Sequence, residues 1–166
     1  MPSGLADDNN LPGNPHPVVC GDASPDDPPI RDEAAEGETH TSSHNIKNNL
    51  NTMHGQPLVF NKPCRYEGCA NIEPHKGSEV EGVLYLILEE DLCKLDKYEG
   101  YPDHYDRRRI TVYTEEGSLE AWIYVAVKTE PGLKPSRKYI DYLIRGTEQH
   151  GLSQQYINFL KSFRKN

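Results

Sequence analysis

The sequence predicts an α+β domain in which strands come first and helices come last. Three observations support this fold class. Strand-like apolar runs fill the first half of the folded region, a glycine-containing turn joins two long β-rich runs, and two amphipathic helical patterns end the chain. Strands followed by helices, with antiparallel hairpins between the strands, are typical of α+β proteins.

Residues 1–49 differ in composition from the rest of the chain. This segment is rich in proline, and residues 1–45 hold nine acidic residues and one basic residue, Arg31, so the whole formal net charge of −8 lies there. Because it has few large apolar side chains, it cannot bury enough surface to offset the entropy of ordering it. We therefore predict a disordered acidic tail over residues 1–49 and a folded domain over residues 50–166.

The folded domain is expected to begin with extended segments. Residues 57–60 predict a short strand, and residues 64–72 a turn-rich extended segment. Residues 78–88 predict the strongest strand, and because its second half is apolar on both faces, a central position is favoured. A short helix over residues 91–98 follows, with acidic residues at its N-terminus, where they suit the helix dipole.

The second half of the domain predicts a hairpin and two helices. The β-rich runs 105–114 and 119–128 are joined by a glycine-containing turn. Proline and glycine residues then break the chain. Ser136 is the expected N-cap of a helix over about residues 137–149, and Ser153 is the expected N-cap of a second helix.

One carboxylate, Glu99, stands at the end of the short helix, directly before Gly100. Leu92, Leu95 and Tyr98 recur at three-residue spacing, which is expected to bury one side of the helix, and the glycine ends it. We expect Glu99 to face the core side, where a partly apolar pocket raises the pKa of a carboxyl group. Such a group suits a general base that works near neutral pH. An ordinary helix-end residue is the alternative interpretation.

The charge pattern disfavours nucleic acids and membranes as partners. Phosphate contacts need clustered lysines and arginines, and the one basic run is Arg107-Arg108-Arg109, for which a solvated or salt-bridged strand is the favoured interpretation. No apolar stretch reaches membrane-spanning length, and no basic region leads into an apolar run near Met1. We therefore predict a cytoplasmic protein.

The cysteines show no metal-ligand pattern. Among the histidines only His40 and His44 share a spacing that would suit two ligands, and they lie in the polar tail with no helix to hold them, so we expect neither a metal nor a cofactor. Cys64 and Cys69 are five residues apart, on segments that predict a strand pair with a turn. A disulfide between them is geometrically allowed, but reduced thiols are expected in a cytoplasmic protein.

Seven short segments carry a resemblance to a known family. They are Ala-Asn-Ile at 70–72, Val-Glu-Gly-Val-Leu-Tyr at 80–85, Leu-Asp-Lys-Tyr-Glu-Gly at 95–100, Tyr-Asp-Arg-Arg at 105–108, Trp-Ile-Tyr-Val-Ala at 122–126, Pro-Ser-Arg-Lys-Tyr at 135–139 and His-Gly-Leu at 150–152. In this order they resemble the motifs of the γ-glutamylcyclotransferase superfamily, which includes the avirulence-induced-gene-like proteins. The resemblance covers about residues 50–166. It implies a small mixed β-barrel with flanking helices.

The resemblance also implies an enzyme that releases 5-oxoproline from γ-glutamyl amino acids or amines. In that family the glutamate at the position of Glu99 takes a proton from the α-amino group of the substrate, which then attacks its own γ-carbonyl carbon. No metal is needed, because both reacting groups belong to one molecule. Tyr105, Tyr124 and Tyr139 resemble tyrosines that line or support the family's pocket and donate to a carboxylate or oxyanion. Packing alone is the alternative for each of these three tyrosines.

The N-terminal part departs from the family pattern. Family members begin with a strand that runs into a Tyr-Gly-Ser-Asn-type loop, and the nearest approach here, residues 17–23, is followed by acidic, proline-rich sequence. We expect the first strand and the loop that cradles the substrate to be missing, which would leave an unpaired sheet edge. The alternative function is therefore a catalytically inactive family member that acts as a binding scaffold. The sequence chooses neither the γ-glutamyl substrate nor the oligomeric state.

Overall fold

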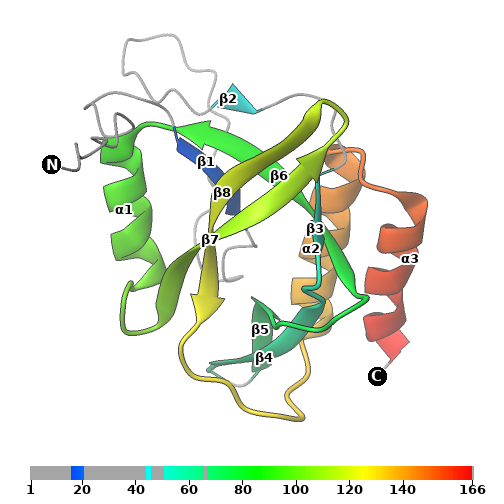
Figure 1. Ribbon diagram of the computed structural model, residues 1–166. Helices are drawn as coiled ribbons and strands as arrows, with labels where there is room; N and C mark the ends of the chain where they lie inside the picture. The colour runs from blue at the N-terminus through cyan, green and yellow to red at the C-terminus, as the bar shows by residue number, and fades with distance from the viewer. Residues whose placement is uncertain (1–15, 21–43, 46–50, 66, 166) are drawn as a thin grey trace, which may run out of the picture.

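The computed structural model describes residues 16–20, 44–45, 51–65 and 67–165, and it has the predicted α+β architecture (Figure 1). Its elements are β1 (His16–Cys20), β2 (His44–Asn45), β3 (Asn51–His54), β4 (Leu58–Cys64), β5 (Glu67–Ile72), β6 (Glu79–Ile87), α1 (Glu89–Glu99), β7 (Tyr105–Thr114), β8 (Gly117–Ala126), α2 (Arg137–Gln149), α3 (Gln154–Ser162) and the 3-10 helix η1 (Phe163–Lys165). The helix α1 lies on one side of the strands, and α2 and α3 lie side by side on the other.

Within the described residues, five strands close into a ring. Their order is β1, β8, β7, β3 and β6, and a further pairing between β6 and β1 joins the two ends. β1 runs parallel to β8, whereas the other pairs of the ring are antiparallel. This is the small mixed β-barrel that the resemblance implied. β4 and β5 pair with each other in a separate sheet.

β1 and β2 fall within the segment that the sequence predicted as a disordered tail, and here the structure differs from the expectation. Val18 lies opposite Tyr85 of β6 and Trp122 of β8, so β1 fills the position of the first barrel strand. Adjacent valines favour extended backbone, and the two neighbouring strands supply its pairing partners, which outweighs the acidic, proline-rich surroundings. The predicted loss of the first strand is wrong. The remainder of residues 1–49 lies outside the described residues.

Two apolar cores support the barrel. The first fills its interior and consists of Met53, Ile72, Val80, Leu84, Val112, Ala121 and Ile123. The second lies between the β4–β5 sheet and the helices α2 and α3, and consists of Phe60, Cys69, Tyr139, Ile140, Leu143, Ile144, Ile157 and Leu160. Burial of these side chains is the main favourable contribution to folding.

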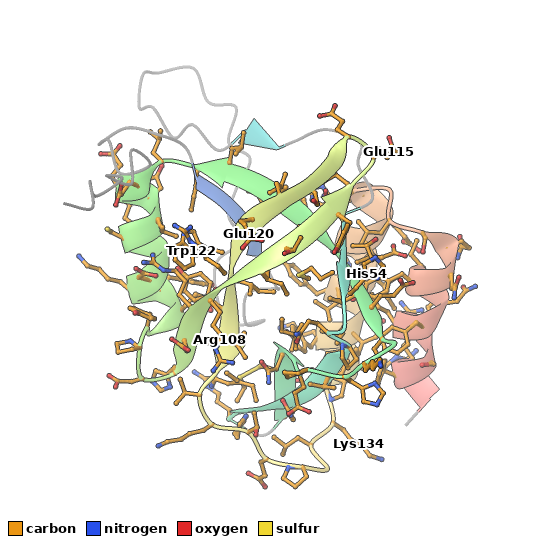
Figure 2. All side chains as sticks on the ribbon, in the orientation of Figure 1. His54, Arg108, Glu115, Glu120, Trp122 and Lys134 are labelled. Atoms are coloured by element: carbon orange, nitrogen blue, oxygen red, sulfur yellow. A yellow bond between two sulfur atoms is a disulfide. The ribbon has the colours of Figure 1, made fainter. Side chains whose placement is uncertain are left out.

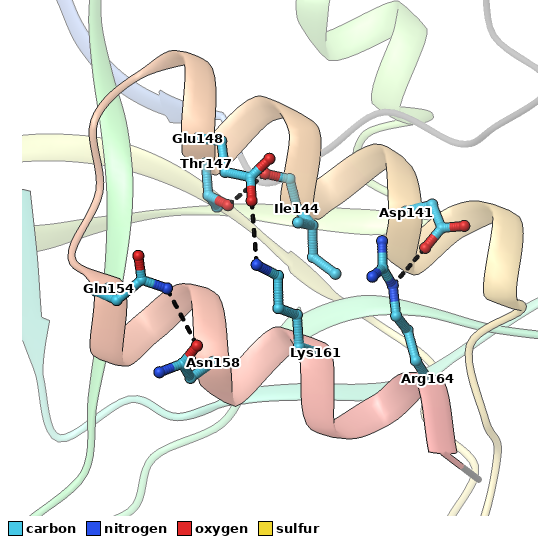
Figure 3. Close-up of polar contacts among 8 residues, drawn as sticks. All are labelled: Asp141, Ile144, Thr147, Glu148, Gln154, Asn158, Lys161 and Arg164. Atoms are coloured by element: carbon cyan, nitrogen blue, oxygen red, sulfur yellow. Dashed lines mark hydrogen bonds and ion pairs between the residues drawn. The ribbon is translucent and has the colours of Figure 1, made fainter.

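The predicted helix starts are confirmed. The Ser136 hydroxyl accepts a hydrogen bond from the Tyr139 backbone N–H at 3.2 Å, and the Ser153 hydroxyl accepts one from the Tyr156 N–H at 3.1 Å. Surface ion pairs join α3 and η1 to α2, with Lys161 beside Glu148 at 3.2 Å and Arg164 beside Asp141 at 2.6 Å (Figure 3). Exposed pairs of this kind add little stability.

Cys64 and Cys69 form a disulfide, so the expectation of reduced thiols is wrong for this pair. The antiparallel pairing of β4 with β5 brings their Cα atoms to 5.9 Å, which lies within the range that a disulfide needs. The bridge fastens the end of the β4–β5 hairpin. Among the described residues, no helix is long and apolar enough to cross a membrane.

Candidate active site

Glu99 is the last residue of α1, and the turn that follows it requires glycine. Gly100 has a φ of +67°, in the left-handed region, and the N–H groups of Gly100 and Tyr101 donate to carbonyls of the last helical turn. A Cβ atom at position 100 would lie 2.6 Å from Cδ2 of His104. The turn therefore fixes where α1 ends and how the half-buried Glu99 side chain leaves it. Leu92 is buried as predicted, but Tyr98 is 43% exposed, so the expectation that Tyr98 lies on the buried side of the helix is wrong.

Lys62 of β4 and Tyr105 of β7 lie near the Glu99 carboxylate. Burial raises the pKa of the Tyr105 hydroxyl, and the negative charge of Glu99 raises it further. Burial lowers the pKa of Lys62, whereas the charge of Glu99 acts in the opposite direction. The Lys62 Nζ atom lies 5.2 Å from the centre of the Tyr105 ring. We call these three residues the Glu99 cluster.

A second polar group begins three residues before Glu99 on the same helix. The Tyr124 hydroxyl donates to Oδ1 of Asp96 at 2.6 Å, and Nη1 of Arg107 donates to Oδ2 at 2.9 Å. The pKa of Tyr124 is raised by burial first and then by this bond to Asp96. Because the hydroxyl already binds Asp96, Tyr124 joins β8 to α1 and reaches the Glu99 cluster through that helix.

The basic run behaves as predicted, as a salt-bridged strand. Arg107 pairs with Asp96, and Nε of Arg108 pairs with Oδ2 of Asp106 at 3.0 Å. The guanidinium groups of Arg107 and Arg109 lie 4.7 and 4.8 Å from the centre of the Trp122 ring. Figure 2 shows Trp122 on the side of the sheet that faces α1. These contacts fasten the helix that carries Glu99 to the barrel.

Tyr139 lies in the second core and has no exposed surface. Its hydroxyl accepts a hydrogen bond from the Ala70 N–H of β5 at 3.1 Å, and its ring meets the edge of Phe60. This placement fits a residue that supports the pocket, because a side chain without exposed surface does not line an open one. Of the three tyrosines, Tyr139 thus has the least structural support for a substrate contact.

Lys62 and Asn71 were not predicted as site residues from the sequence. Asn71 is 5% exposed, its Oδ1 accepts from the Ala126 N–H at 2.9 Å, and its Nδ2 donates to Oδ1 of Asn61 at 2.9 Å. Because Ala126 pairs with Tyr105, Asn71 fixes the strand ends beside the Glu99 cluster. The available signal for Asn71 was a polar residue between apolar neighbours in the segment 70–72. Lys62 had no such signal.

The structure also has a cavity of about 250 Å³ that lies away from the Glu99 cluster. It is lined by Leu58, Val59, Phe60, Leu133, Lys134, Pro135 and Phe163. Figure 2 shows Lys134 on the loop that precedes α2, well separated from Trp122. No member of the Glu99 cluster lines this cavity. The candidate site is therefore identified by its charged and polar side chains and not by the position of the cavity. The described residues contain no group of three or more His, Cys, Asp or Glu side chains that could hold a metal ion.

Comparisons with known proteins agree with this fold. The AIG2-like family matches residues 79–160, which include Glu99 and the three tyrosines. The γ-glutamylcyclotransferase of Bos taurus is 30% identical over 113 residues, which are 68% of this chain and 60% of that protein. The γ-glutamylaminecyclotransferase B of Danio rerio is 31% identical over 110 residues, which are 63% of this chain and 56% of that protein.

A solved structure of a γ-glutamyl cyclotransferase has a similar fold. Its TM-score is 0.66 at 24% sequence identity, and the match covers 72% of this chain and 74% of that one. The chain spans less than two thirds of the length of the two curated relatives.

Proposed function

Because the chain belongs to the γ-glutamylcyclotransferase superfamily, we propose that it is an enzyme that releases 5-oxoproline from a small γ-glutamyl amino acid or γ-glutamyl amine. The observation that carries the proposal is the Glu99 carboxylate, held at a glycine-terminated helix end beside Tyr105 and Lys62. A carboxylate fixed in this way has the chemistry that the reaction needs from a general base.

In the proposed reaction, Glu99 removes a proton from the α-ammonium group of the substrate. The freed amine attacks the γ-carbonyl carbon of the same molecule, and the new C–N bond closes a five-membered ring. The ring nitrogen then loses its second proton and the bond to the leaving nitrogen breaks. The leaving nitrogen takes up both protons, one of them from Glu99, and departs as an ammonium group. The products are 5-oxoproline and the free amine or amino acid. Ring closure gains from proximity, because the attacking and attacked atoms are already linked.

The tyrosines have different proposed roles. Tyr105, next to Glu99, donates its hydroxyl to a substrate oxygen, and its raised pKa keeps that proton in place near neutral pH. Tyr124 orients α1 through Asp96, and Tyr139 supports β5 from the core. Substrate contacts by Tyr124 and Tyr139, and a cytoplasmic location, stay predictions.

The inactive-scaffold alternative is not favoured. It depended on the loss of the first strand and of the loop after it. β1 occupies the place of that strand between β6 and β8, whereas the position of the loop, after Cys20, lies outside the described residues. The name of the Danio rerio relative implies an amine as the leaving group, whereas the name of the Bos taurus relative does not specify one. Both γ-glutamyl amino acids and γ-glutamyl amines therefore belong in the test.

The test is release of 5-oxoproline from a panel of γ-glutamyl dipeptides and γ-glutamyl amines by the purified chain, its Glu99→Gln variant and its Glu90→Gln variant. We expect Glu99→Gln to lower kcat by about 10²–10⁴-fold, the usual contribution of a general base. Glu90, exposed in the first turn of α1, is the matched control and should leave kcat unchanged.

Two outcomes would contradict the proposal in different ways. Turnover that persists in Glu99→Gln would remove Glu99 as the base. A folded wild-type protein that releases no 5-oxoproline from any member of the panel would show that the chain lacks the activity.

A further inference from the structure

We propose that Lys62 binds the α-carboxylate of the γ-glutamyl moiety, so that the site selects substrates whose glutamyl end is a free amino acid. The inference rests on the proposed function, since it names the part of the same substrate that this lysine recognises. It assigns a specificity-determining role to a residue of β4, a strand outside the segment that matches the AIG2-like family.

The charges of the Glu99 cluster are complementary to an amino acid. A glutamyl end carries an ammonium group and a carboxylate on the same carbon, and the reaction brings its amino group to Glu99. The carboxylate must then lie within a few bond lengths of Glu99, where it would be repelled unless a cation is present. Lys62 is close enough to Glu99 for their charges to interact. The charges of Glu99 and Lys62 are therefore complementary to the ammonium group and the carboxylate of the substrate.

Arg107, a second cation that contacts this helix, already has binding partners. Its guanidinium binds Asp96 at 2.9 Å and packs against the rings of Trp122 and Tyr101 at 4.7 and 5.5 Å. The Nζ atom of Lys62, in contrast, donates to the adjacent Pro63 carbonyl at 3.2 Å in an exposed contact. Exchanging that contact for a substrate carboxylate costs little, and a charge-assisted hydrogen bond replaces a neutral acceptor.

The backbone of β4 changes register just before Lys62. Val59 pairs with Asn71 and Lys62 pairs with Cys69, so a bulge or irregularity lies between these two pairs. Bulges turn a side chain away from the direction that regular alternation would give it, and they are frequent next to active sites. The irregularity accounts for a lysine that reaches Glu99 and Tyr105 from a strand of a different sheet.

The backbone of β4 is fixed both before and after Lys62. On one side, the Asn61 side chain accepts from Asn71 and donates to Glu73, and the Asn61 carbonyl accepts from the Glu130 N–H at 2.8 Å. On the other side, the Cys64–Cys69 disulfide closes the hairpin. Partial burial also lowers the pKa of Lys62, which means that its charge is incompletely solvated without a ligand. A lysine whose backbone is fixed and whose charge is incompletely solvated is stabilised more by binding a carboxylate than a fully solvated surface lysine is.

The test compares two substrates across four proteins. The first substrate is the γ-glutamyl compound that the wild-type protein turns over fastest, and the second is its analogue in which the glutamyl α-carboxylate is an α-carboxamide. The proteins are the wild type, Lys62→Met, Lys62→Arg and Lys161→Met. Lys161 is the matched control, because it is an α3 lysine paired with Glu148 (Figure 3). Thermal unfolding of each variant accompanies the kinetics.

We expect the wild type to prefer the carboxylate substrate in kcat/KM by about 10- to 100-fold, the range for a hydrogen bond to a charged group. Lys62→Met should abolish that preference mainly by lowering kcat/KM for the carboxylate substrate, Lys62→Arg should retain part of it, and Lys161→Met should leave it unchanged. If Lys62→Met lowers kcat/KM for both substrates by the same factor, the lysine acts on Glu99 or on the fold, and the inference is wrong.

Failure of the proposed function would be recognised separately. If the wild type releases no 5-oxoproline, equilibrium binding of γ-glutamyl-alanine and of its α-carboxamide analogue replaces turnover. A preference for the carboxylate that disappears in Lys62→Met would support the role of Lys62 in a site that binds without catalysing. The absence of any preference would overturn it.

Discussion

Tyr105 and Tyr113 lie on the same strand in different surroundings. Tyr105 is half-buried beside Glu99 with Lys62 near its ring, whereas Tyr113 is 46% exposed and packs only its ring against His54 in the contacts described. We expect Tyr105→Phe to lower kcat/KM for 5-oxoproline release by about tenfold or more, because a hydroxyl donor to the substrate is lost while the ring remains. Tyr113→Phe should have no effect. Equal kinetics for both variants would show that the Tyr105 hydroxyl does not reach the substrate.

The residues of the site were not equally predictable. Glu99 could be identified because its motif, a short amphipathic helix and a glycine stop coincide within a few residues. Lys62 could not, since a lysine on a strand usually points to solvent, and its contact with Tyr105 depends on the register change in β4. Asp96 was visible in the motif, but the two hydrogen bonds that occupy it come from other elements, from β7 at a separation of 11 residues and from β8 at a separation of 28 residues.

At the scale of the element, the end of α1 depends on Gly100. Gly151 offers a matched comparison, because its φ of +69° is nearly the same but a Cβ atom there would meet nothing within 4 Å. We expect Gly151→Ala to lower the free energy of unfolding by about 1–2 kcal/mol, the cost of a left-handed alanine. Gly100→Ala should cost about 1–3 kcal/mol more, from the contact with His104.

The same pair of variants also tests the site. Because Gly100 determines how Glu99 leaves the helix, Gly100→Ala should lower kcat for 5-oxoproline release at temperatures where the variant is folded, and Gly151→Ala should not. Chemical denaturation gives the stabilities, and the release assay gives the rates. Equal stabilities for the two variants would show that the ring of His104 yields to the new methyl group.

Sequence signals were strongest for the elements with a local cause. The two helices with serine caps, the hairpin of β7 and β8 and the central strand β6 all follow from periodicity or turn chemistry. β1 was missed because its flanks carry the signature of disorder, and its strand state depends on partners far along the chain. The Cys64–Cys69 disulfide was not predicted, because thiols are usually reduced in the cytoplasm, although the spacing of the two cysteines on a strand pair allowed the bridge.

At the scale of the whole molecule, β1 closes the barrel by pairing on both sides. Proline cannot donate to a sheet and is tolerated at the first residue of a strand, so Val19→Pro and His16→Pro differ in their expected cost. We expect Val19→Pro to lower the free energy of unfolding by about 1–3 kcal/mol, because proline has no backbone N–H and a carbonyl of the neighbouring strand would lose its hydrogen-bond donor. His16→Pro should cost less. Equal and negligible effects in chemical denaturation would contradict closure by β1.

The position of β1 has a consequence for how the chain acquires its structure. β1 is near the N-terminus, yet its partners are the end of β6 and the middle of β8. During synthesis its residues leave the ribosome before either partner has been made. Pairs so distant in the sequence raise the contact order and close large loops, which slows folding. We therefore expect β1 to join the barrel only after β6 and β8 have formed.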